Sequence, residues 1–224
     1  MTTTAEEPPY FPAKAPTPLA DADSALALLD PVLGQLADVV ARVTPDALNG
    51  PTPCTKYDVA TLRDHVLGWL QFFAAAFADP GRTGPRPDPD AYRAADDERD
   101  LADVVRRSAA TISDAVRGGV LDRQVVLAQS RMDGPAALGM VLGEYLVHGW
   151  DLAAAVGAPW TPPERACETA LEFFRGVVLP EYRGEDGGFF GAEVPVPDDA
   201  PALDRLLGFA GRRSAWPESS RSER

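Results

Sequence analysis

Glu144 and His148 are the side chains with the clearest chemical potential, because they stand four residues apart in an otherwise apolar run. On an α-helix, residues at this spacing share one face, with Cβ atoms roughly 6 Å apart. Two such side chains can bind one ion at ligand distances of about 2.0 to 2.2 Å. The pair could therefore chelate a divalent metal, although an intrahelical Glu–His pair at a helix seam has the same spacing.

His65 is the only other histidine in the chain, and helical spacing puts it on one face with the apolar residues Leu62, Trp69, Phe72 and Ala76. A lone inward histidine is more often a core residue bonded to a backbone carbonyl than a metal ligand. With Glu144 and His148, however, it would complete the three-ligand set of a catalytic metal site, in which a further coordination position stays open.

Several other side chains are candidates for the surroundings of such a site. Trp69 and Phe72, with Val141 from the second ligand segment, would line an apolar substrate pocket. Tyr145 and Asp151 are candidate catalytic groups that could handle protons or support a ligand, and for both the alternative is a purely structural role.

Two glycines and two cysteines add smaller clues. Gly143 and Gly149 bracket the Glu–His pair, and since each costs about 1 kcal/mol in a helix interior, they suggest close packing or ligand access, although a helix end near Gly149 would also explain one of them. Cys54 and Cys167 are too few for a disulfide scaffold and are expected to be reduced and inert.

The elements that must position these residues are mostly helices. Apolar periodicity, capping residues and Pro/Gly breaks predict helices at about 30–43, 59–78, 90–117, 135–157, 163–179 and 201–210. Pro31 allows either a kink in a longer first helix or a start with Asp30 as the N-cap, and we prefer the start. Residues 121–127 fit a short strand or an extended connector.

The chain is long enough for one well-packed core and requires no second domain. The sequence predicts a disordered arm over residues 1–20, a single helical domain over 21–211 and a disordered tail over 212–224. Residues 185–191 place glycines around two phenylalanines, which suits either a flap over a pocket or a loop that fastens the last helix.

A net charge of −13 argues against nucleic acid or an acidic membrane surface as a partner. No apolar run approaches the roughly 20 residues needed to span a bilayer, and the first residues lack the layout of a signal peptide. We therefore expect a cytoplasmic monomer or homodimer whose partner is a small-molecule substrate.

A family resemblance is carried by two segments of the sequence. The first contains Thr52, Pro53, Cys54, Tyr57, Asp58, Val59, Leu62 and His65, and the second is residues 144–152. They resemble the mycothiol-dependent maleylpyruvate isomerase N-terminal family, part of the DinB-like metal-binding superfamily, over about residues 24–211. Residues 121–123 and 190–197 are similar to a branch of actinobacterial DinB-like proteins. Two departures weigh against maleylpyruvate itself as the substrate: Tyr57 replaces the more usual indole, and no sterol-carrier-like C-terminal domain is visible.

The resemblance implies an all-α, DinB-like four-helix bundle with additional C-terminal helices and room for a short extended segment. It also implies a divalent ion, commonly Zn²⁺, with Ni²⁺, Co²⁺, Fe²⁺ and Mn²⁺ as alternatives, held by His65, Glu144 and His148. In some members a low-molecular-weight thiol such as mycothiol is activated on the metal.

The leading hypothesis is a metal-dependent enzyme in which the ion activates a water or a thiol toward a small organic substrate. S-transfer, thiol-dependent isomerisation and a lyase or cyclisation step all fit this chemistry. The alternatives are a non-catalytic metal- or ligand-binding module and a helical bundle whose Glu–His pair is purely structural.

Overall fold

The computed structural model describes residues 8–95, 100–184 and 190–216, and this part of the chain is mostly helical. The helices are α1 (Ala22–Val40), α2 (Val59–Ala78), α3 (Leu101–Arg117), α4 (Gly134–Val156), α5 (Glu164–Val177) and α6 (Ala202–Phe209). Between α3 and α4, the strands β1 (Gln124–Leu127) and β2 (Ser130–Asp133) form an antiparallel hairpin. The predominantly helical fold class is confirmed, and the short extended segment is this hairpin.

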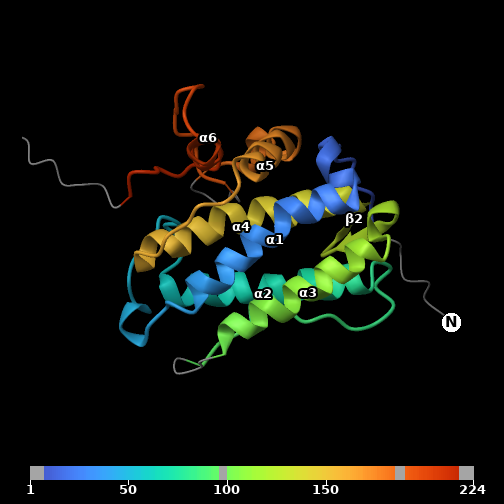
Figure 1. Cartoon of the computed structure of the whole chain (residues 1–224), viewed down its shortest axis with the longest axis horizontal. Helices are drawn as coiled ribbons and strands as arrows, with labels where there is room; N and C mark the ends of the chain where they lie inside the picture. The colour runs from blue at the N-terminus through green and yellow to red at the C-terminus, as the bar shows by residue number, and fades with distance from the viewer. Residues whose placement is uncertain (1–7, 96–99, 185–189, 217–224) are drawn as a thin grey trace, which may run out of the picture.

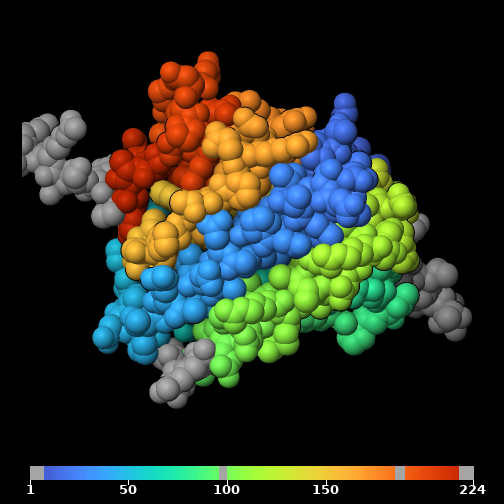
Figure 2. All heavy atoms as spheres, in the orientation of Figure 1, coloured from blue at the N-terminus to red at the C-terminus, as the bar shows by residue number. Residues whose placement is uncertain are grey.

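The four long helices form a closed arrangement, because α1 and α2 each pack against both α3 and α4. Their inward faces supply one continuous apolar core. Figure 2 shows α1 running beside α3 on one closely packed face. The shorter helices follow outside this group: α5 packs on α4, and α6 packs on α5, on the side of α4 that faces away from α3 (Figure 1).

Helix α1 is longer than the sequence predicts. It begins after Asp21, whose carboxylate accepts a hydrogen bond from the backbone N–H of Ser24 at 2.9 Å, and it continues through Pro31. Leu26 and Leu33, on either side of the proline, are both buried. A proline inside a helix costs about 3 kcal/mol, and burying two leucines offsets much of this cost at roughly 1.5 to 3 kcal/mol each. The predicted start at Asp30 is therefore wrong.

Helix α3 is shorter than predicted, because it begins at Leu101 and not near Asp90. Residues 88–95 instead run along α2. The backbone N–H of Ala94 donates to Asp64 at 3.2 Å, and Arg63 donates to the carbonyl of Ala94 at 3.2 Å. These bonds satisfy the backbone of residue 94 without a helix. Residues 96–99, which also fall in the predicted helix, lie outside the described residues.

Both predicted disordered ends contain segments that pack on the bundle. Within the arm, the N–H of Phe11 donates to the carbonyl of Arg131 at 2.7 Å, and Leu19 is buried. Within the tail, Arg212 is 9% exposed. Apolar burial fastens the first segment and an ion pair fastens the second. The prediction of disorder is therefore wrong for the described residues 8–20 and 212–216. Residues 1–7 and 217–224 lie outside the described part of the chain.

The two helices that carry the candidate ligands follow their sequence signals closely. Helix α2 spans the predicted residues, and the side chain of Asp58 caps it by accepting from the N–H of Thr61 at 2.8 Å. Helix α4 begins at the predicted turn and ends at Val156, before Gly157, whose φ of +65° suits a left-handed capping residue. None of the helices in the described ranges combines the length and apolarity needed to cross a bilayer.

Candidate metal centre

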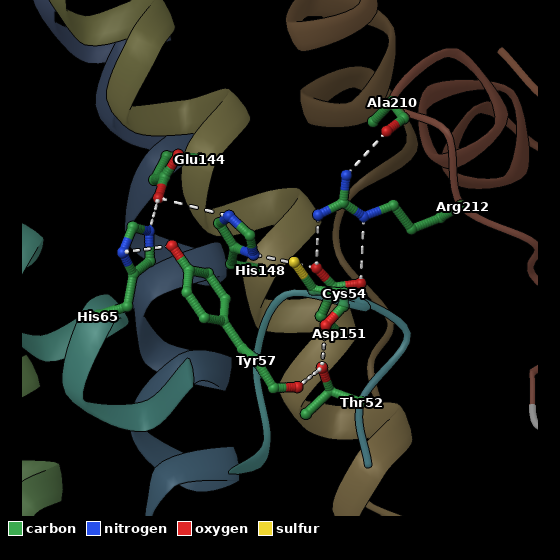
Figure 3. Close-up of polar contacts among 9 residues, drawn as sticks. All are labelled: Thr52, Cys54, Tyr57, His65, Glu144, His148, Asp151, Ala210 and Arg212. Atoms are coloured by element: carbon green, nitrogen blue, oxygen red, sulfur yellow. Dashed lines mark hydrogen bonds and ion pairs between the residues drawn. The ribbon is translucent and has the colours of Figure 1, made fainter. Parts of the chain in front are cut away.

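Three predicted ligands converge where α2 packs on α4. His65 Nε2 lies 3.1 Å from Glu144 Oε1, and His148 Nε2 lies 3.7 Å from the same oxygen (Figure 3). One donor atom from each of the three residues lies within 4.8 Å of the other two. The structure thus brings together side chains that are 79 residues apart in the sequence.

The spacing of these atoms fits a single small cation. Two ligand atoms that each lie about 2.1 Å from a tetrahedral ion are separated by about 3.4 Å. The observed separations of 3.1 and 3.7 Å lie on either side of that value. The side chains of His65, Glu144 and His148 are 19%, 27% and 13% exposed, so the site lies at the edge of the core, within reach of small solutes.

The charges at the site are arranged to keep Glu144 ionised. Desolvation favours the neutral acid, but the charge of His148 and the hydrogen bond from His65 outweigh it and lower the pKa of Glu144 to about 2. Burial likewise opposes the charged form of His148, yet Glu144 and Asp151 outweigh it and raise its pKa. In the absence of a cation, the site therefore stores negative charge on Glu144 and attracts a proton to His148.

The second nitrogen of His148 has a firm partner on its own helix. Nδ1 lies 3.0 Å from Asp151 Oδ2, and Asp151 is fully buried. Arg212 closes on the same carboxylate, with Nε 3.4 Å from Oδ1 and a terminal nitrogen 3.1 Å from Oδ2 (Figure 3). Asp151 was predicted as a catalytic or supporting group, and this geometry makes it a support for His148. Sequence reasoning missed Arg212, since no spacing pattern links it to a helix 61 residues away.

The second nitrogen of His65 has a weaker partner. The hydroxyl of Tyr57 lies 3.5 Å from His65 Nδ1, and its ring centroid is 5.0 Å from that of His65 and 6.3 Å from that of His148. The hydroxyl of Thr52 bonds the carbonyls of Cys54 and Tyr57, which folds the loop before α2 under the site. Burial raises the pKa of Tyr57, so its hydroxyl keeps its proton. The one sequence signal that could have identified Tyr57 as a site residue was its position in the motif that carries the family resemblance.

The other predicted site residues separate into two groups. The ring of Trp69 lies 6.2 Å from that of His65, and Phe72 packs edge-on to Trp69 at 5.3 Å, so an aromatic wall adjoins the centre. Val141 is fully buried and lines no accessible surface. Tyr145 is also fully buried; its hydroxyl donates to the carbonyl of Val66 at 3.4 Å, and burial raises its pKa well above 10. Tyr145 therefore belongs to the core.

The glycines that bracket the ligand pair serve packing. A Cβ atom added at Gly143 would lie 2.2 Å from the ring of Phe174, and one at Gly149 would lie 2.4 Å from the ring of Trp160. Aromatic side chains of α5 and of the loop before it fill these positions. Of the two readings of the glycines, the structure selects close packing.

Cys54 lies near His148 and Asp151, and burial raises the pKa of its thiol. Its sulfur, one nitrogen of His148 and an oxygen of Asp151 lie within 4.8 Å of one another. Arg212 already neutralises Asp151 there, so a second cation would meet a fixed positive charge. Cys167 is buried as well, and neither cysteine is paired.

Comparison with known proteins adds a family to this geometry. A family model described as the mycothiol maleylpyruvate isomerase N-terminal domain matches residues 29–153. The chain belongs to this family. The matched part contains α2, the part of α4 up to residue 153 and with it Asp151, whereas α5, α6 and Arg212 follow it.

Two relatives of this family member come from Mycobacterium tuberculosis: the uncharacterized protein Rv0738 of strain H37Rv and the uncharacterized protein MT0763 of strain CDC 1551. Each is 32% identical over 179 residues, which cover 79% of this chain and 91% of the relative. No solved structure matches the chain.

Proposed function

We propose that this protein is a metal-dependent enzyme that acts on a small organic substrate, with a divalent ion held by His65, Glu144 and His148. The observation that carries the proposal is the convergence of one α2 histidine with the α4 Glu–His pair at the spacing of a single ion. Two imidazoles and a carboxylate form a known catalytic zinc set, and Ni²⁺, Co²⁺, Fe²⁺ and Mn²⁺ also accept these donors. The packing of α1–α4 supports a DinB-like bundle.

The ion would supply a Lewis acid that makes a water or a thiol acidic enough to act as a nucleophile near neutral pH. The chain's own residues do the rest. Asp151 orients the His148 ring, and Glu144 stays ionised because its pKa is about 2. The Tyr57 hydroxyl holds a proton beside His65, and Trp69 covers one side of the centre with apolar surface.

The family's description names mycothiol, and this supports a low-molecular-weight thiol as cosubstrate. S-transfer, thiol-dependent isomerisation and a thiol-assisted lyase or cyclisation step are the reactions that such a centre serves. The partly exposed ligands and the aromatic wall suit a small, partly apolar substrate.

Metal analysis combined with thiol titration tests the proposal. We expect stoichiometric metal in the wild type and its loss in His65→Ala and Glu144→Gln. Glu168→Gln is the matched control, because Glu168 is a half-exposed α5 carboxylate paired with Arg205; this variant should bind metal as the wild type does. Adding mycothiol to the Co²⁺-substituted protein should change its visible spectrum. A wild type that binds no metal would refute the proposal.

A non-catalytic binding module is the second candidate. One observation favours it: Asp151 is fully engaged by His148 and Arg212, and Tyr145 lies in the core, so neither predicted catalytic residue is free to exchange protons with a substrate. Stoichiometric metal together with a Co²⁺ spectrum that changes neither with added thiol nor with the ionisation of a bound water near neutral pH would select this candidate.

A further inference from the structure

We infer that Arg212 is a positioning residue for the metal centre: acting through Asp151, it fixes the orientation and tautomer of His148, so that the segment after α6 completes the centre. This inference rests on the proposed metal site. It concerns a residue beyond the part of the chain that the family model matches.

The chain of contacts is continuous. A terminal nitrogen of Arg212 and Nδ1 of His148 both bond Asp151 Oδ2, at 3.1 and 3.0 Å. An ionised carboxylate only accepts hydrogen bonds, so Nδ1 of His148 must carry the hydrogen. The lone pair is then on Nε2, the nitrogen that faces Glu144. Partners of this kind orient a metal-binding histidine and fix its tautomer.

The carboxylate needs the arginine. Asp151 is fully buried, and an unpaired buried charge is strongly unfavourable. Arg212 neutralises it through two bonds, and it donates a third hydrogen bond from its remaining nitrogen to the carbonyl of Ala210 at 2.8 Å. The guanidinium is therefore held in one orientation from both sides.

The backbone around α6 is built to deliver this side chain. The N–H of Arg212 bonds the carbonyl of Leu207 at 2.8 Å, which closes the end of the helix. Gly211 has a φ of +83°, and a Cβ there would lie 2.8 Å from Gly191, so only glycine fits the turn that directs Arg212 inward. Arg183 ties the same region together by donating to the carbonyls of Gly191 and Phe209.

Coupling of this kind is reciprocal: if docking of the segment strengthens metal binding, then metal binding must strengthen docking. We therefore expect Zn²⁺ to slow amide hydrogen exchange across 206–213 in the wild type. Exchange in this segment that Zn²⁺ leaves unchanged would contradict the inference.

The decisive variant is Arg212→Gln, compared with Arg205→Gln, an α6 arginine whose partner Glu168 lies away from the centre. By competition with a chromophoric chelator, we expect Arg212→Gln to bind Zn²⁺ about 10- to 100-fold more weakly and Arg205→Gln to match the wild type. Equal affinity in a folded Arg212→Gln protein would overturn the inference.

A metal-free measurement separates this inference from the proposed function. The chain has two histidines, so imidazole ¹⁵N spectra contain two ring systems. At a pH above the raised pKa of His148, where the ring is neutral, we expect a single Nδ1–H tautomer in the wild type and a tautomer mixture in Arg212→Gln. If Arg212→Gln does not fold, Arg212→Lys keeps the charge but loses the two-bond fork, and should show the same change to a smaller degree. A wild type without metal affinity would refute the proposed function, whereas an unchanged tautomer would refute the positioning role.

Discussion

The two histidines of the centre have very different supports. His148 is backed by a buried carboxylate at 3.0 Å and, beyond it, by the guanidinium of Arg212. His65 is backed by one neutral hydroxyl at 3.5 Å, on a loop residue that is half-buried. His148 is therefore held by a buried ion pair, while His65 is held by a long hydrogen bond and aromatic packing.

This difference assigns separate tasks to the two sides. A firmly oriented His148 and an ionised Glu144 on the same helix form a preorganised pair of donors. In the proposed metal site His65 would be the more adjustable donor, because a hydrogen bond of 3.5 Å constrains a ring weakly. We expect changes to the groups that support His148 to affect folding and metal affinity, and changes to the hydroxyl that supports His65 to have small effects on both.

The largest effect should follow from Asp151→Ala. Removing this carboxylate leaves Arg212 buried without its partner, which costs about 3 to 5 kcal/mol of folding free energy. Urea unfolding of the metal-free protein measures the loss. A double variant, Asp151→Leu with Arg212→Met, removes both charges and should recover most of it. If the free energy of unfolding of Asp151→Ala lies within about 1 kcal/mol of the wild-type value, the support of His148 is not stronger than that of His65.

An intermediate effect concerns pH. Because the pKa of His148 is raised, the ring stays protonated up to a higher pH than is usual for histidine. A metal ion that binds His148 below that pH must displace the proton. Metal affinity should therefore rise by as much as about tenfold per pH unit below that pKa and level off above it. The same proton stabilises the metal-free fold; this contribution is fully present below about pH 6.5 and is lost as pH rises through the raised pKa.

Competition titrations from pH 6 to 9 measure this profile. Asp151→Asn should move the plateau to lower pH, because it removes a charge that raises the pKa of His148. Tyr57→Phe should leave the plateau in place. Affinity that does not change with pH in the wild type would contradict the assignment of His148 as a ligand.

The smallest effect is expected for Tyr57→Phe. The variant keeps the aromatic ring beside both histidines and removes only a long hydrogen bond. Stability should change by less than about 0.5 kcal/mol and metal affinity by no more than about twofold. A tenfold loss of metal affinity would show that the His65 side is as firmly supported as the other.

Local signals in the sequence predicted the parts of the fold that position the ligands. Asp58 and the apolar stripe of α2 set the face on which His65 lies, and the turn before α4 does the same for Glu144 and His148. The face of α2 that carries His65 and the face of α4 that carries Glu144 and His148 both point into the bundle, where they can meet. The convergence follows from helical periodicity, while metal binding itself stays a prediction.

The elements that were predicted wrongly depend on contacts between distant residues. The first turns of α1 persist through Pro31 because the bundle buries the leucines on both sides of it. Residues 88–95 form only a short 3-10 helix, Pro89–Ala91, and no α-helix, because Arg63 and Asp64 satisfy the backbone at Ala94. The pairing of Arg212 with Asp151 depends on the packing of α5 on α4 and of α6 on α5. None of these partners can be read from local spacing.

The glycines of α4 carry a consequence for dissecting the molecule. Phe174 and Trp160 occupy the places where Gly143 and Gly149 lack side chains, and both rings belong to the part of the chain that follows residue 153, where the family match ends. A fragment trimmed at that boundary would leave two ring-sized indentations on the ligand helix open to water. In this protein the segment that the family model matches is therefore shorter than the unit that packs around the ligand helix, and a stable fragment should retain α5 and α6.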